Sequence, residues 1–124
     1  MIPSKKNILV IEDHDSLRLL LGNFLSKTYS VTTKKDGLEG MSWIGKGNIP
    51  DLILLDLGLP QLNGLDFLRN IRTSGFFSKI PVVVVSGNRE EDDINQCLAL
   101  GAKGYVTKPF NPLKLNETVS SAIA

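Results

Sequence analysis

The sequence predicts a doubly wound α/β domain, in which a five-stranded parallel sheet carries helices on both faces. Segments typical of strands and of helices alternate five times along the 124 residues, and three of the strand segments are continuously apolar. Such alternation produces parallel strands joined by right-handed helical crossovers. A chain of this length fits one core, so we expect a single domain over residues 1–124, with its core at about 7–123.

The composition of each strand segment predicts its place in the sheet. Aliphatic runs at 8–11, 52–55 and 82–85 are typical of strands that are buried on both faces. The segments 30–33 and 104–107 are half polar, which favours the two edges of the sheet, where one flank of a strand meets water. We therefore expect three central strands and two edge strands.

The first two predicted helices differ in the strength of their signals. Asp15 can cap the first helix. Its apolar stripe at helical spacing consists of Leu17, Leu20, Leu21, Phe24 and Leu25. The segment 37–46, with Leu38, Met41 and Ile44, predicts a weaker helix, because Gly40 costs about 1 kcal/mol relative to alanine.

The remaining helices have clear start signals. The segment 63–73 carries apolar residues at helical spacing, and the next helix begins at about Glu90 with four acidic residues, where the helix dipole favours negative charge. The last helix has Asn111 as its expected N-cap and Pro112 in its first turn, where a missing N–H costs nothing.

Bulk properties exclude several classes of protein. Fourteen basic residues against thirteen acidic ones leave a net charge of +1, which predicts neither nucleic-acid binding nor attraction to a membrane surface. Cys97 is the single cysteine, so no internal disulfide can form, and we find no signal peptide or membrane span. We expect a cytoplasmic protein.

Reactive side chains follow the strand segments. Ligands of doubly wound folds bind beyond the carboxyl ends of the strands, so polar residues at these ends are expected to gather at one rim. They are Glu12 and Asp13 after the first strand, Asp56 after the third, Ser86 after the fourth, and Tyr105, Thr107 and Lys108 along and after the fifth. Any one of them could simply solvate a strand end or cap a helix, but the whole set is not explained in this way.

The expected cluster of carboxylates predicts a bound cation. Three carboxylates at one rim repel each other unless cations neutralise them. Oxygen ligands without histidine or cysteine favour a hard ion such as Mg²⁺. A rim that combines Mg²⁺, the Lys108 ammonium group and the Ser86 hydroxyl suits phosphoryl transfer, with Asp56 as the nucleophile.

Four motifs together resemble the receiver domains of bacterial two-component response regulators, over essentially the full length of the chain. This family includes the single-domain chemotaxis regulators, which the chain also resembles. They are ILVIED at 8–13, LLDLGLPQLNG at 54–64, VVVVSG at 82–87 and GAKGYVTKPF at 101–110. The resemblance implies a flavodoxin-like sheet of order 2-1-3-4-5 and a signalling switch rather than an enzyme. It also implies a cis peptide bond between Lys108 and Pro109.

The resemblance assigns roles to the residues at the predicted rim. Asp56 would be the phosphoacceptor, and Glu12, Asp13, Asp56 and the backbone carbonyl of Gly58 would hold Mg²⁺. Lys108 would pair with the phosphoryl group and Ser86 would hydrogen-bond to it, while Tyr105 would swing inward as Ser86 moves.

The same resemblance implies the partners. They are a sensor histidine kinase or a phosphotransfer protein as phosphodonor, and a downstream protein that binds the face of the fourth helix, fifth strand and fifth helix. A phosphorylation-dependent dimer is compatible with this scheme. No output domain is expected in this chain, and neither DNA nor a membrane is an expected ligand. Glu12, Leu59 and Gly87 depart mildly from the family pattern, and Gly58 and Asn88 lie where side chains influence dephosphorylation.

Three other interpretations are weaker. Residues 40–47 approach the phosphate-binding pattern G-x-x-x-x-G-K-[ST] but end in Gly47 and follow no strand directly. A phosphatase of the haloacid-dehalogenase type needs a second aspartate where Gly58 stands, so self-hydrolysis of a phospho-aspartate should be slow. A binding module without phosphoryl chemistry would share the fold, yet it would not need Asp56, Ser86 and Lys108 together.

A few conspicuous side chains receive structural interpretations. His14 is expected in a solvated turn rather than in a phosphate relay. Cys97, Trp43 and Met41 are expected to be packing residues. The pair at 76–77 is expected to pack against the edge of the sheet.

Overall fold

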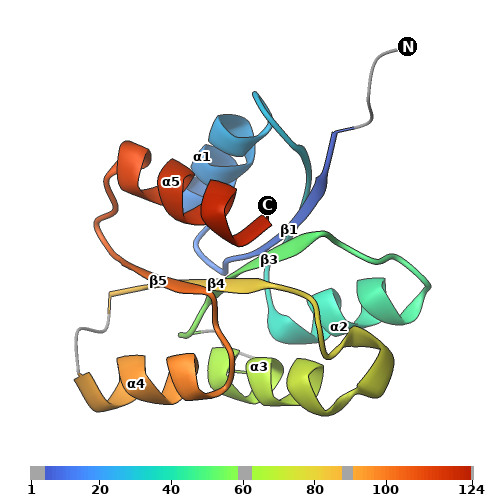
Figure 1. The fold of residues 1–124 in the computed structure, drawn as a ribbon. Coiled ribbons are helices and arrows are strands. Elements are labelled where there is room, and N and C mark those ends of the chain that lie inside the picture. The colour runs from blue at the N-terminus through green and yellow to red at the C-terminus, as the bar shows by residue number, and fades with distance from the viewer. Residues whose placement is uncertain (1–4, 59–62, 88–90, 124) are drawn as a thin grey trace.

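A computed structural model describes residues 5–58, 63–87 and 91–123 and confirms the predicted α/β architecture (Figure 1). Five parallel strands form one sheet in the order β2-β1-β3-β4-β5. The strands are β1 (Asn7–Ile11), β2 (Ser30–Lys34), β3 (Leu52–Asp56), β4 (Val82–Ser86) and β5 (Gly104–Thr107). The half-polar strands β2 and β5 lie at the two edges, as their composition predicts.

Helices cover both faces of the sheet (Figure 1). On one face lie α1 (Asp15–Leu25) and α5 (Pro112–Ile123). On the other lie α2 (Gly37–Gly45), α3 (Gly64–Thr73) and α4 (Glu91–Ala99), with a short 3₁₀ turn at Gly75–Phe77 after α3. Among the described residues, no helix combines the length and the apolar character that crossing a bilayer would require.

Two cores result, because successive residues of a strand point to opposite faces of the sheet. In β1, Leu9 and Ile11 pack toward α2 and α3, whereas Ile8 and Val10 pack toward α1 and α5. All five residues of β3 and of β4 are buried, as expected for central strands of a parallel sheet. Asp56 and Ser86 therefore end strands that are packed on both faces.

The start of α1 differs from the prediction. His14 occupies the N-cap position without a side-chain cap, and Asp15 is already the first helical residue, where its carboxylate pairs with Arg18. Leu21 and Leu25 are buried as predicted, but Leu20 is 56% exposed. The predicted apolar stripe is wider than the strip of α1 that the sheet covers.

Gly40 has a packing role that the sequence reading missed. A Cβ atom at this position would lie 2.6 Å from Cδ1 of Ile11 and 3.3 Å from the ring of Phe67. The glycine thus lets α2 approach β1 and α3 closely. The Asp36 side chain, which accepts a hydrogen bond from the Glu39 N–H at 2.8 Å, caps the helix and offsets part of the propensity cost.

Arg72, near the end of α3, joins two loops at the amino end of the sheet. Its Nε donates to the Leu100 carbonyl at 2.9 Å and its Nη2 to that of Gly101 at 3.1 Å. Its Nη1 donates to the carbonyls of Ser78 at 3.1 Å and Ile80 at 2.8 Å. The guanidinium group thereby holds the segments that lead into β4 and β5, the strands that carry Ser86 and Tyr105.

Replacing Arg72 with methionine should lower the free energy of unfolding by about 2–4 kcal/mol, because three partly buried carbonyls and one exposed carbonyl lose a charged donor. Urea denaturation followed by circular dichroism measures this loss. Arg69→Met is the control, since the Arg69 side chain forms an exposed ion pair with Asp66 at 3.3 Å, and its loss should cost about 0.5 kcal/mol or less. Equal losses in the two variants would contradict the role of Arg72.

Candidate functional site

The predicted polar residues meet at the carboxyl ends of the strands. Asp56 is the last residue of β3 and Ser86 the last of β4, while Glu12 directly follows β1 and Lys108 directly follows β5. The backbone pairing continues past the strand ends, because the Lys108 N–H donates to the Ser86 carbonyl at 2.8 Å. Neighbouring strands therefore place these side chains at one rim.

Three carboxylates form the centre of this rim. One oxygen from each of Glu12, Asp13 and Asp56 lies within 4.8 Å of the others. Glu12 and Asp56 are buried, whereas Asp13 is exposed and leaves the cluster open to solvent on one side. Buried carboxylates at this separation need positive charge, and an all-oxygen donor set suits a hard divalent cation.

Lys108 supplies one positive charge to the cluster. Its Nζ lies 2.8 Å from Oε1 of Glu12 and 3.5 Å from Oδ1 of Asp56. Burial alone would lower the pKa of Lys108, but the hydrogen bond to Glu12 and the nearby carboxylate charges outweigh it, so that the pKa is raised. The ammonium group thus stays charged at neutral pH.

Burial acts on the pKa of Glu12 in the opposite direction to its action on the pKa of Lys108. Desolvation raises the pKa of the Glu12 carboxyl to about 7, and the hydrogen bond from Lys108 opposes this rise. The neighbouring Asp56 adds to it. A pKa raised in this way means that the Glu12 carboxylate lacks neighbouring positive charge, which is the condition that favours binding of a further cation.

The backbone after β3 is packed against the acidic centre. The Gly58 N–H donates to Oδ1 of Asp56 at 3.2 Å, and the Gly64 N–H donates to the Leu57 carbonyl at 3.0 Å. A Cβ atom on Gly64 would overlap the Asp56 carbonyl oxygen and would lie 2.5 Å from Cα of Leu57. Glycine at the start of α3 is thus required for the helix to approach the end of β3.

Gly64→Ala should lower the free energy of unfolding by about 1–3 kcal/mol, since rigid backbone atoms have to move to admit the methyl group. The Asp56 amide resonance should also shift in ¹H–¹⁵N spectra. Gly45→Ala in α2 is the matched control, because its Cβ atom would meet no atom within 4 Å. A Gly64→Ala variant as stable as the Gly45→Ala variant would contradict this packing.

Ser86 and Tyr105 lie on neighbouring strands, with Ser86 opposite Thr107 in the register. Burial raises the pKa of Tyr105, and a hydrogen bond with Ser86 opposes that rise. The hydroxyl group at the end of β4 is thereby in contact with the aromatic side chain of β5. Ser86 is buried, and Tyr105 packs partly against the core beneath α4.

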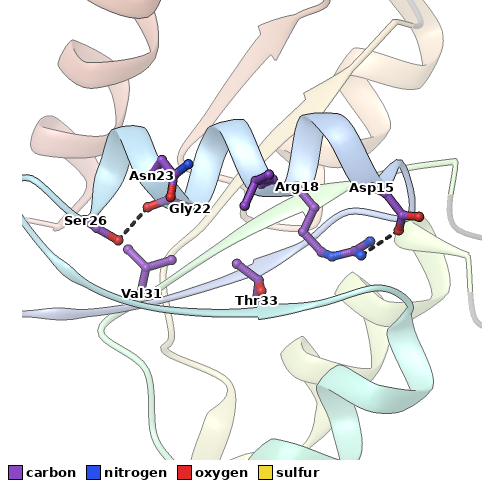
Figure 2. Close-up of a pocket in the computed structure, with 8 residues that line it drawn as sticks. Asp15, Arg18, Gly22, Asn23, Ser26, Val31 and Thr33 are labelled. Carbon is purple, nitrogen blue, oxygen red and sulfur yellow. Dashed lines mark hydrogen bonds and ion pairs between the residues drawn. The ribbon is translucent and has the colours of Figure 1, made fainter.

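Arg18 is a site residue that the sequence reading missed. Its Nη1 donates to the carbonyls of Glu12 at 3.0 Å and Asp13 at 3.4 Å, and its Nη2 pairs with Asp15 at 2.6 Å. Figure 2 shows the guanidinium group extended toward Asp15. Arg18 and Asp15 help to line a groove of about 460 Å³ between α1 and β2. Arg18 thus holds the loop that carries two of the three carboxylates. An arginine that binds backbone carbonyls has no sequence motif that would reveal it.

The structurally interpreted residues lie where they were expected. His14 is exposed, and its backbone N–H donates to Oε2 of Glu12 at 3.2 Å. The P-loop-like stretch at 40–47 lies in α2 and its end rather than in a loop after a strand. Cys97 is fully buried. Trp43, Met41 and Phe77 pack against the core. The predictions that concern the side chain of Phe76 and the residues Leu59, Asn88 and Glu90 fall outside the described residues.

The last two elements also match their predictions. The Asn111 side chain accepts hydrogen bonds from the N–H groups of Leu113 at 2.8 Å and Lys114 at 3.3 Å, so it caps α5. The Lys108–Pro109 peptide bond is cis, as the resemblance implies. The Gly58 amide is placed beside Asp56, while its carbonyl as a metal ligand stays a prediction.

Related sequences are found among bacterial transcriptional regulators. The transcriptional regulatory protein KdpE of Staphylococcus aureus is 39% identical over 115 residues, which is 93% of this chain and 48% of KdpE. The alkaline phosphatase synthesis transcriptional regulatory protein PhoP of Bacillus subtilis is 35% identical over 95% of this chain and 48% of its own length. The chain spans about half the length of the curated relatives it matches.

Similar solved structures have the same fold, and they include a response regulator and a receiver domain. The chemotaxis response regulator CheY4 of Vibrio cholerae superposes with a TM-score of 0.88 at 26% identity, over 96% of this chain and 99% of that chain. The receiver domain of the sensor histidine kinase PA1611 of Pseudomonas aeruginosa, described with a magnesium ion in its active-site cleft, gives 0.86 at 27% identity over 97% and 98%. The family model for the response regulator receiver domain matches residues 8–120. The chain therefore belongs to the receiver domains of two-component response regulators.

Proposed function

We propose that Asp56 accepts a phosphoryl group and that this event switches the affinity of the domain for a protein partner. The observation that supports this most directly is the Lys108 ammonium group 3.5 Å from the Asp56 carboxylate, within a cluster of three carboxylates. A nucleophile, a fixed cation and an oxygen-rich cation site are the parts that phosphoryl transfer requires. We place the domain in the cytoplasm, together with its phosphodonor.

The proposed transfer needs few groups. An Asp56 carboxylate oxygen attacks phosphorus, the bond from phosphorus to the donor histidine nitrogen breaks, and the nitrogen keeps the electron pair. Lys108 pairs with a phosphoryl oxygen and Ser86 donates a hydrogen bond to another. Glu12, Asp13, Asp56 and the Gly58 carbonyl would hold Mg²⁺, which neutralises charge on the phosphoryl oxygens when bound.

We propose a slow return to the resting state. Hydrolysis of a phospho-aspartate needs a group that activates water, and an acid or base two residues after the nucleophile could do so. Gly58 has no side chain to serve in this way. The phosphorylated domain should therefore persist as a signalling state, with at most slow self-dephosphorylation.

The switch would run through Ser86 and Tyr105. A phosphoryl oxygen that draws the Ser86 hydroxyl group toward itself competes with the hydrogen bond between Ser86 and Tyr105. Tyr105 belongs to β5, and Figure 1 shows this strand between α4 and α5 on one side of the molecule. We propose that the face formed by α4, β5 and α5 binds the downstream protein, or a second copy of the domain, with an affinity that depends on phosphorylation.

An apolar groove beside the acidic centre suits the phosphodonor. It has a volume of about 380 Å³ and is lined by Leu17, Leu20, Lys108, Pro109, Phe110 and Pro112. Leu20 is one of the exposed large apolar residues of α1. A protein that brings a phosphohistidine to Asp56 has to cover the surface around the rim, and a sensor histidine kinase or phosphotransfer protein could bury this groove.

Leu20→Ser should slow phosphotransfer from a phosphohistidine protein roughly tenfold through loss of apolar contact, without slowing phosphorylation by acetyl phosphate. Rates of transfer from a phosphorylated histidine phosphotransfer domain that serves the wild type give the test. Leu38→Ser is the matched control, because Leu38 in α2 is equally exposed at 56% but lies away from the groove. Equal transfer rates in both variants would contradict docking at the groove.

Beryllofluoride, which binds a carboxylate oxygen as a phosphoryl mimic, tests the proposed switch without turnover. In the presence of Mg²⁺ it should shift ¹H–¹⁵N resonances at Asp56, Ser86 and Tyr105 and along the α4-β5-α5 face. Asp56→Asn should abolish these shifts. An unchanged wild-type spectrum would instead favour a binding module that signals without phosphoryl chemistry.

A further inference from the structure

Strand β2 has one backbone edge that no strand among the described residues pairs with. The Ser30 N–H donates to the Lys6 carbonyl at 2.9 Å, so Ser30 directs its backbone groups toward β1. Alternate residues of a strand direct these groups to opposite sides. The N–H and C=O groups of Val31 and Thr33 therefore point outward, where a further strand could pair with them.

The groove of about 460 Å³ between α1 and β2 lies on one face of the sheet beside this edge, and we call it the α1 groove. Val31 and Thr33 line it from β2, and Figure 2 shows both residues beside α1. Leu19 contributes an apolar side chain that is 66% exposed. A Cβ atom on Gly22 would lie 3.3 Å from Cγ2 of Thr33, so the glycine leaves room between helix and strand. The middle of the α1 groove therefore suits an apolar side chain.

A second groove, of about 150 Å³, lies between β2 and α2 on the other face of the sheet, and we call it the α2 groove. It is lined by Lys34, Glu39, Ser42, Trp43 and Lys46. Its carboxylate, on Glu39, already pairs with Lys35 at 3.7 Å. The lysines of the α2 groove thus give it a positive charge, which suits an acidic side chain.

We propose that the outer edge of β2 binds an extended segment of a partner protein as an additional strand, with apolar side chains in the α1 groove and acidic side chains in the α2 groove. Successive side chains of a strand point to opposite faces, so one segment could fill both grooves while its backbone pairs with Val31 and Thr33. Lysine on an edge strand discourages pairing between like strands, and β2 has no acidic residue that a second copy could offer to Lys34. The charge therefore favours an acidic partner segment over self-association.

This surface is separate from the two protein-binding surfaces proposed above. β2 and β5 lie at opposite edges of the sheet, and the apolar groove proposed for the phosphodonor contains no residue of β2. Binding at the β2 edge should therefore be equally strong in the wild type and in Asp56→Asn. A failure of phosphoryl transfer would leave this inference standing, and a failure of binding here would leave the proposed function standing.

Two short acetylated peptides test the proposal with the full ¹⁵N-labelled chain: valine alternates with glutamate in one and with lysine in the control. The glutamate peptide should shift the amide resonances of Val31 and Thr33 and the indole resonance of Trp43, the single tryptophan of the chain. It should bind about tenfold more tightly than the lysine peptide. Absence of these shifts at millimolar glutamate peptide, or equal affinity for the two peptides, would overturn the proposal.

Thr33→Pro should weaken binding of the glutamate peptide about tenfold, because proline removes an outward N–H and leaves the pairing with β1 in place. Thr33→Val, which keeps the N–H, is the matched control. Unchanged affinity in Thr33→Pro would overturn strand addition. Shifts of the same resonances when the protein is concentrated without peptide would assign the edge to a second copy and would also overturn the proposal.

A charge reversal keeps the test decisive even where Thr33→Pro fails to fold. Lys46→Glu, at the exposed end of α2, should remove the preference for the glutamate peptide. Lys114→Glu is the matched control, because Lys114 is exposed on α5, away from β2, and this variant should keep the preference. A preference that survives Lys46→Glu would overturn the role of the α2 groove.

Discussion

Asp56→Asn is expected to reduce phosphoryl incorporation at least roughly 10³-fold, to background, because the amide that replaces the carboxylate is a very poor nucleophile. The substitution keeps the size of the side chain at a buried strand end. It also removes one of three carboxylates that lie within 4.8 Å, so the free energy of unfolding should be unchanged or higher. Loss of incorporation without loss of stability is the combination that a phosphoacceptor predicts.

Gel electrophoresis that retards phosphorylated protein, combined with urea denaturation, measures both quantities for Asp56→Asn. Asp92→Asn is the control, since Asp92 is an exposed carboxylate in the first turn of α4 and takes no part in the acidic cluster. It should be phosphorylated like the wild type. Incorporation that persists in Asp56→Asn would assign the phosphoacceptor to another side chain.

Lys108→Met is expected to slow phosphorylation by acetyl phosphate roughly 10²-fold, because the transition state loses a preorganised cation. The same substitution should strengthen metal binding. The ammonium group lies 2.8 Å and 3.5 Å from two carboxylates of the cluster, so its removal leaves them more negative and should tighten Mg²⁺ binding. No simple unfolding of the site gives that pair of results.

The rate is measured with intact protein at saturating Mg²⁺, and the metal affinity by calorimetry. Lys79→Met is a suitable control because Lys79 is exposed in the turn after α3. Weaker Mg²⁺ binding in Lys108→Met would mean that the lysine organises the carboxylates rather than competing with the metal. An unchanged phosphorylation rate would remove Lys108 from the mechanism.

The parts of this account that the sequence predicted share one physical basis. Apolar runs locate buried strands, and the topology of parallel strands brings whatever follows them to one edge. Glu12, Asp56 and Lys108 could therefore be grouped although they are far apart in the chain. The edge positions of β2 and β5 followed from their polarity in the same way.

The parts that the sequence did not predict depend on contacts without a local pattern. Arg18 and Arg72 bind backbone carbonyls, which every residue possesses, so no motif identifies their partners. The capping role expected of Asp15 was wrong because the helix begins one residue earlier, at His14 as N-cap. Leu20 fits the helical period, but its burial depends on how much of α1 the sheet covers.

The central claim is that Asp56 takes a phosphoryl group with the help of Mg²⁺, and intact mass after incubation with acetyl phosphate tests it most directly. The wild type is compared with and without Mg²⁺, beside Asp56→Ala. We expect a gain of one phosphoryl group in the wild type that requires Mg²⁺ and is absent from the variant. No gain in the wild type, or an equal gain in Asp56→Ala, would contradict the claim.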